Sequence, residues 1–145
     1  MKAPHFVRFI RALYDSMKIK YSANNEISIE GSKDEFSRLM DSITKLIYSD
    51  GDAISINVET NFNPEPYDNH GIGLTIKKSK SNSIEITEKK LIISGEQNFL
   101  LSIASNLPFD VESIPYHVHY DAISFPQYLN ENSPDIVFEA TSEVV

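Results

Sequence analysis

The feature that most constrains this fold is an internal repeat at an offset of 64 residues. The segment ISIEG at 27–31 corresponds to LIISG at 91–95, and apolar residues follow each at i, i+3, i+4 and i+7, the spacing of one helix stripe. The stripes are Phe36, Leu39, Met40 and Ile43 in the first copy and Leu100, Ile103, Ala104 and Leu107 in the second. Later matches pair Ile54 and Ile56 with Val118 and Tyr120, and Ile72 and Leu74 with Ile136 and Phe138. The chain is therefore expected to contain one structural unit twice.

Each copy predicts a strand, a glycine, a helix and two strands, in units of about 27–76 and 91–140. The glycine is expected to supply a backbone bend between strand and helix. Ser32 and Glu35 have capping-box spacing at the first helix start, and Pro108 stops the second helix. We predict a single α+β domain over residues 1–145, with a mainly antiparallel sheet built from the two βαββ units. Both helices would cover one face of this sheet, and its other face would be polar.

Further elements flank the units. Residues 83–87 alternate like a half-buried strand, and 17–21 occupy the same place before the first unit. Residues 4–16 are expected to form an extra N-terminal helix, since their apolar residues fall on one side. The segments 61–70 and 124–134 are rich in Pro, Asn and aromatic residues, so we expect surface loops there.

The charge is placed unevenly. The 145 residues carry a formal net charge of −8, yet residues 91–145 contain no Lys or Arg, and all 13 basic residues lie before them. One reading is that acidity keeps the protein dissolved. The other is a surface shaped for a basic partner, because a patch of one sign steers association with the opposite charge.

Composition also excludes several classes. An acidic chain is a poor candidate for binding nucleic acid, because binding to the phosphate backbone needs clustered Lys and Arg. The βαββ duplication is loosely similar to the halves of DNA sliding-clamp domains, but the expected helices carry too few basic residues to face DNA, so no function is taken from it. No apolar run is long enough to span a membrane. Arg8 and Arg11 interrupt the N-terminal apolar stretch, so a signal peptide is not expected, and the absence of cysteine fits a cytoplasmic location.

One group of residues could form a metal site. His117, His119 and Asp121 would project from one face of a strand, and two imidazoles with a carboxylate can bind zinc. The string resembles part of the H-x-H-x-D-H motif of metallo-β-lactamase-like hydrolases, although its last histidine is replaced by Ala122. The alternatives are an exposed polar sheet face and a partner-binding surface. Gly71 and Gly73 lack the lysine and helix of a phosphate loop, and no serine has a nucleophile-elbow context. We therefore expect no enzyme and no cofactor.

A resemblance to a known protein family suggests a function for this chain. The motif Ile-x-Ile-x-Gly before an amphipathic helix, the His-x-His strand and the strand at 133–139 together resemble small immunity proteins of bacterial polymorphic-toxin systems, including contact-dependent growth inhibition. The resemblance covers roughly residues 84–139. It implies a protein that binds a cognate basic toxin domain, often a nuclease, and occludes its active site. Its partner would be this protein, with no nucleic acid and no membrane.

Candidate partner contacts are acids and tyrosines in expected loops, because tyrosine anchors an interface and charge orients it. The first choices are Asp110, Glu112, Tyr116, Asp121, Tyr128, Glu131 and Asp135, and the second choices are Asp50, Asp52 and Tyr67. Two other functions stay open, a small metal-dependent hydrolase using the His-x-His-x-Asp strand and a generic adaptor domain.

Overall fold

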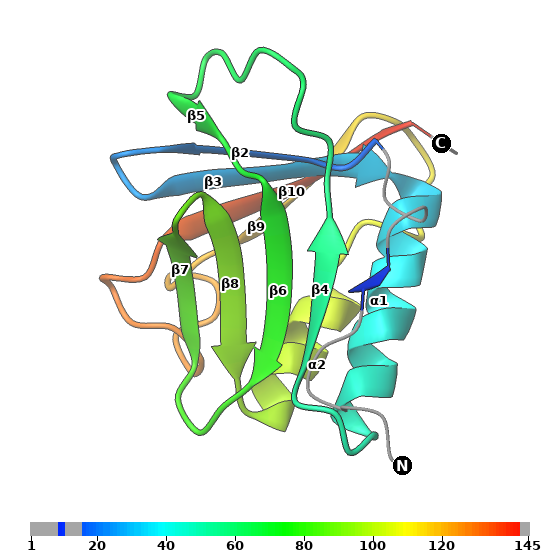
Figure 1. Cartoon of the computed structure of the whole chain (residues 1–145), viewed down its shortest axis with the longest axis vertical. Coiled ribbons are helices and arrows are strands. Elements are labelled where there is room, and N and C mark those ends of the chain that lie inside the picture. The colour runs from blue at the N-terminus through cyan, green and yellow to red at the C-terminus, as the bar shows by residue number, and fades with distance from the viewer. Residues whose placement is uncertain (1–8, 11–15, 143–145) are drawn as a thin grey trace.

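The computed structural model describes the backbone of residues 9–10 and residues 16–142 in full. In chain order the elements are β1 (Phe9–Ile10), β2 (Lys18–Ser22), β3 (Glu26–Ser32), α1 (Lys33–Ile47), β4 (Ala53–Asn57), β5 (Asn69–His70), β6 (Gly73–Lys78), β7 (Ser83–Thr87), β8 (Lys90–Gly95), α2 (Gln97–Ser105), β9 (Tyr116–Tyr120) and β10 (Asp135–Ser142). The protein is α+β, and the order strand, helix, strand, strand occurs twice, as the repeat predicts (Figure 1).

The strands form two sheets, which corrects the expectation of one mainly antiparallel sheet. Sheet A has the order β1-β4-β6-β8-β7, and sheet B has the order β5-β2-β3-β10-β9. Each sheet combines antiparallel pairs with a central parallel pair, β6 with β8 in sheet A and β3 with β10 in sheet B. Both central pairs join strands of different units. The alternation of apolar residues shows which face of a strand is buried, but it does not show which strands pair.

The repeat is also shifted at its last strand. In the parallel and antiparallel registers, Ile136 takes the place of Leu74 and Phe138 takes that of Ile76. The predicted matches of Ile72 with Ile136 and Leu74 with Phe138 are therefore wrong by two residues. The error was invisible in the sequence because a shift of two residues keeps the same side chains on the same face.

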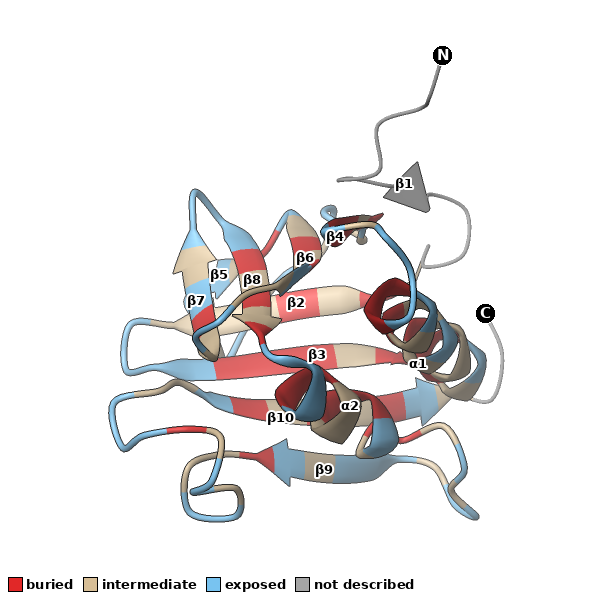
Figure 2. Ribbon diagram, turned by 90° about the horizontal axis from the view of Figure 1, so that it is seen from below, coloured by how far each residue is buried: buried red, intermediate tan, exposed pale blue. Residues whose placement is uncertain are grey.

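The buried apolar side chains of both sheets and both helices form one cluster. The two helices pack against each other, and the inner strand positions and the inner helix sides are buried (Figure 2). Aromatic rings link the units, since Phe36 of α1 meets Phe138 of β10 edge to face, with ring centroids 6.2 Å apart. Of the outward positions, those of Glu26, Asp135, Lys77 and Lys90 are exposed, whereas that of Ser28 is buried.

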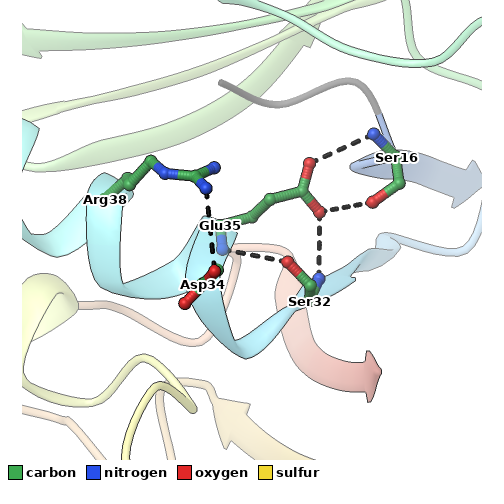
Figure 3. Close-up of polar contacts among 5 residues, drawn as sticks. All are labelled: Ser16, Ser32, Asp34, Glu35 and Arg38. Carbon is green, nitrogen blue, oxygen red and sulfur yellow. Dashed lines mark hydrogen bonds and ion pairs between the residues drawn. The ribbon is translucent and has the colours of Figure 1, made fainter. Parts of the chain in front are cut away.

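A buried carboxylate fixes the start of α1 (Figure 3). Glu35 is fully buried and accepts hydrogen bonds from the Ser32 backbone N–H at 2.9 Å, the Ser16 N–H at 3.1 Å and the Ser16 hydroxyl at 2.6 Å. The Ser32 side chain accepts from the Glu35 N–H, which completes the predicted capping box. Glu35 therefore ties the entry to β2 to the start of the helix.

The glycines before the helices serve a different purpose from the one expected. No glycine in the described residues has a positive φ, so neither Gly31 nor Gly95 is needed for its conformational freedom. At Gly95 the need is space, because an added Cβ would lie 2.4 Å from the ring of Phe99 and 2.5 Å from the side chain of Asn82.

The prediction of an N-terminal helix is wrong for the part of that segment that the structure describes. Phe9–Ile10 form β1, which pairs in parallel with β4. The rest of the segment 4–15 lies outside the described residues. The loop expected at 61–70 also contains β5, which pairs with β2 through Lys20 and Tyr21.

Candidate binding surface

Carboxylates gather on the outer face of sheet B. The strands alternate between buried inner positions, such as Ile27 and Ile136, and outward positions, so Glu26 and Asp135 face solvent. We call the set that lies on or directly after β3, β10 and β9 the acidic face. It consists of Glu26, Glu30, Asp121, Asp135 and Glu139.

Strand register sets these carboxylates side by side. In the parallel pair of β3 and β10, Glu26 is the partner of Asp135 and Glu30 is the partner of Glu139. Asp121 follows Tyr120, which pairs with Ile136, so it comes next to Asp135 on the other side. Neighbouring strands lie only about 4.8 Å apart, and like charges in adjacent positions destabilise a sheet. The acidic face therefore carries electrostatic repulsion within the folded protein.

The negative charges of the acidic face are neutralised by nearby positive groups to different degrees. Lys20 lies 2.5 Å from Glu30, and both side chains are largely buried, so this pair is well formed. His117 Nδ1 lies 3.7 Å from the Glu139 carboxylate, and it adds positive charge only when protonated. Within the described residues, neither Glu26 nor Asp135 has a salt bridge. The repulsion is thus least relieved in the row of Glu26, Asp135 and Asp121.

The histidine strand lies on this same face. His117 and His119 are exposed and point outward from β9, as the alternation predicts. Asp121 accepts a hydrogen bond from the Ser124 backbone N–H at 2.8 Å, which stabilises the turn after the strand. Residues 16–142 contain no group of three or more His, Asp or Glu side chains placed to hold a metal ion. The histidines therefore border the acidic face without forming a metal centre in this part of the chain.

The predicted contacts separate into different places. Asp121 and Asp135 join the acidic face, and Glu131 lies on the loop between them. Asp110, Glu112 and Tyr116 lie at the opposite end of β9, where the Lys33 ammonium donates to the Val111 carbonyl at 2.8 Å. Asp50 and Asp52 lie in the turn between α1 and β4, and Tyr67 lies in the loop between β4 and β5. Of the predicted contacts, the structure therefore brings together Asp121 and Asp135, and the other residues lie on loops or in other parts of the fold.

Several aromatic residues near the acids pack internally. Tyr128 is half-buried, with its ring centroid 6.0 Å from that of Phe99. Tyr120 is fully buried, stacks on Phe125 at 3.9 Å and donates a hydrogen bond to the Ser102 hydroxyl at 2.7 Å. Burial raises the pKa of Tyr120 to about 12. Tyr120 is thus neutral at physiological pH and belongs to the core.

Three residues of the acidic face were not predicted as partner contacts from the sequence, namely Glu26, Glu30 and Glu139. Glu26 and Glu30 lie in the first unit, and they join the others only because β3 pairs with β10 of the second unit. Their alternation with buried isoleucines predicts an outward position. No signal in the sequence shows that this outward face meets Asp135 and Glu139.

Comparisons with known proteins leave the function to be argued from this geometry. No family model matches the chain, and no curated protein sequence matches it. Neither helix in the described part of the chain is long and apolar enough to cross a membrane.

Proposed function

We propose that this protein is an immunity protein that binds a basic toxin domain, a nuclease, and blocks its active site through the acidic face. The observation that carries the proposal is the register that places Glu26 beside Asp135 and Glu30 beside Glu139. The Glu26–Asp135 pair, which has no salt bridge among the described residues, is expected to destabilise the free protein, and a cationic partner would remove that penalty on binding. A nuclease cleft that holds phosphates offers such cations.

Solubility alone explains the arrangement less well. Negative charge keeps a protein dissolved wherever it is placed on the surface. Scattered carboxylates would achieve this without repulsion between adjacent strands. On this side of the molecule carboxylates lie on β3 and β10 and directly after β9, these three strands contain no Lys or Arg, and the basic residues Lys18 and Lys20 are confined to β2. This concentration favours a binding surface, because a patch of one sign steers a partner of the opposite sign. In this proposal the protein acts in the cytoplasm, without a catalytic step.

The biological test is co-expression with the C-terminal domain encoded by the adjacent open reading frame, scored by cell survival. We expect the wild-type chain to protect the cells and to bind the toxin domain in a pull-down. Growth arrest despite folded, expressed protein would contradict the proposed function.

The physical test compares two double variants that each remove two negative charges. Glu26→Gln with Asp135→Asn alters the acidic face, and Asp50→Asn with Asp52→Asn alters a distant turn. We expect the first variant to slow association with the toxin domain about tenfold and to flatten its salt dependence, because charge acts mainly on the association rate. The second variant should behave as wild type. Equal slowing in both would point to net charge rather than to this face, and no slowing in the first would exclude the acidic face.

A further inference from the structure

The edges of the two sheets are not equally covered. In sheet A, β1 pairs with the outer edge of β4, and in sheet B, β5 pairs with the outer edge of β2. The opposite edge of sheet A is β7, which pairs only with β8 among the described strands. Strand β7 contains no proline, no lysine and no bulge, and the exposed Glu85 is its one charged residue, so few of the features that commonly protect an exposed edge are present.

The turn after β7 determines which backbone groups face outward. Glu88 and Lys89 have φ of 52° and 65°, so they form a two-residue turn of type I′ between Thr87 and Lys90. The residues that flank such a turn form a hydrogen-bonded pair, and bonded pairs alternate along the ladder. Ile84 and Ile86 therefore direct their N–H and C=O groups away from β8, where a further strand could bind them.

A groove runs along this edge. It has a volume of about 350 Å³, and Ile84, Glu85 and Ile86 of β7 form one wall. Tyr21 and Asn25 at the β2–β3 hairpin form another wall, and Pro134 before β10 contributes to a third. The described ends of the chain lie on the opposite side of the molecule, beside α1 and β4 (Figure 1).

The charge around the groove is negative. Among the described residues that line it, Glu85 is the one that carries a charge. Glu26 and Asp135 directly follow the lining residues Asn25 and Pro134, and the Asp135 N–H donates to the Asn25 carbonyl at 2.9 Å. Lys89 lies in the turn after β7 and Lys90 begins β8, and neither of them lines the groove. The groove is thus continuous with the acidic face.

We propose that this groove binds an extended, lysine- or arginine-containing segment of a protein partner, which adds to sheet A as a strand beside β7. Backbone hydrogen bonds to Ile84 and Ile86 would hold the segment, and Glu85, Glu26 and Asp135 would select its basic side chains. A second copy of this chain suits the site less well, because each copy carries a net charge of −8. The identity of the partner as a toxin rests on the proposed function, but the site itself does not.

The first experiment uses a short synthetic peptide in which lysine alternates with valine. Titrated into isotope-labelled protein, it is expected to protect the Ile84 and Ile86 amides from hydrogen exchange. The same peptide with N-methylated backbone amides, or with glutamate in place of lysine, should bind at least tenfold more weakly. Chemical-shift changes confined to the outer face of sheet B, or no change at saturating peptide, would overturn the strand-addition mode. Concentration-dependent self-association that protects the same amides without peptide would also overturn it.

The second experiment separates this inference from the proposed function. Ile86→Pro removes one outward N–H, and an edge strand tolerates proline at such a position. We expect this variant to dissociate from the toxin domain about tenfold faster while its core amide spectrum is unchanged. Normal neutralisation by Ile86→Pro, together with failure of the Glu26→Gln and Asp135→Asn variant, would refute strand addition and leave the acidic face intact. Loss of toxin binding by the wild type would remove the proposed function, and the peptide titration would still decide the groove.

Discussion

The two sheets share their inner faces and differ in their outer faces. Ile27 and Ile136 inside sheet B occupy the places of Leu91 and Leu74 inside sheet A. Outside, Glu26 and Glu139 of sheet B occupy the places of Lys90 and Lys77 in sheet A. Packing in a common core restricts the inner positions to apolar residues of similar size. The fold places no such restriction on the outer positions, so charge could become concentrated on one face.

The sheets also differ in how each is joined to its helix. The start of β2, in sheet B, is tied to α1 by the carboxylate of Glu35. The start of β7, in sheet A, is tied to α2 by Asn82, whose side-chain oxygen accepts from the Glu96 N–H at 3.0 Å. The same connection is therefore made by a buried charge in one unit and by a neutral amide in the other. Variants at equivalent positions should distinguish these two solutions.

The largest difference is expected at the glycines that precede the helices. Gly95→Ala should destabilise the protein by about 3 kcal/mol, because the new Cβ meets the Phe99 ring and also lies 3.2 Å from the Asn82 Cα. Gly31→Ala should cost about 1 kcal/mol, since its nearest neighbours, Glu35 Oε1 at 3.2 Å and Met17 Cε at 3.3 Å, need to move by only a few tenths of an ångström. Urea unfolding measures both. Equal losses would show that the two sites are equivalent in packing.

Removal of the helix links should give the next largest effect. Glu35→Ala leaves the donors of Ser16 and Ser32 without their charged acceptor, and we expect a loss of about 2–3 kcal/mol. Asn82→Ala removes two neutral hydrogen bonds, to the Glu96 N–H and from the amide to the Tyr128 carbonyl, and should cost about 1 kcal/mol. Thermal or urea unfolding of the two variants at neutral pH tests the order, and the reverse order would contradict it.

Alkaline pH should lower the stability of the protein through Tyr120 of sheet B, whereas its counterpart in sheet A, Ile56, has no group that titrates. The folded pKa of Tyr120 is about 12, above its ordinary value of 10.0, so the folded state holds the proton more tightly than the unfolded state. This contribution to stability is fully present below pH 10 and is lost as the pH rises towards 12. By pH 11 the loss should be about 1 kcal/mol. Tyr120→Phe should show a shallower decline of unfolding free energy between pH 9 and pH 11, and identical slopes would exclude this cause.

The smallest expected effect is an increase in the stability of the protein. Glu26→Gln together with Asp135→Asn should raise stability at low salt by about 0.5–1 kcal/mol, because it relieves the adjacent like charges of sheet B. Lys77→Gln is the control on sheet A, where Lys77 pairs with Ala53 on one side and Ser94 on the other, and should change little. The gain should shrink in high salt. A destabilised double variant would show that these carboxylates stabilise the fold.

Local parts of the fold were predictable. The capping box of Ser32 and Glu35, the strand at 83–87 and the stripe of α1 depend on residues close in sequence, and the structure confirms them. The second stripe is confirmed for Leu100, Ile103 and Ala104, whereas Leu107 is buried beyond the end of α2 at Ser105. The N-terminal helix failed at Phe9–Ile10, because pairing with β4 outweighs the helical spacing of its apolar residues. The acidic face was only partly predictable, since Asp121 and Asp135 were identified without the neighbours that give them their electrostatic setting.

The sequence by itself determined the duplication, the apolar inner positions and the uneven distribution of charge, since each is written in residue spacing and composition. Tertiary structure alone decided that strands of different units pair in two sheets, that Glu26 lies beside Asp135, and that β7 keeps an open edge. The physical reason is the period of a strand. Alternation assigns each side chain to a face, but the partner strand and its register depend on packing across the whole core.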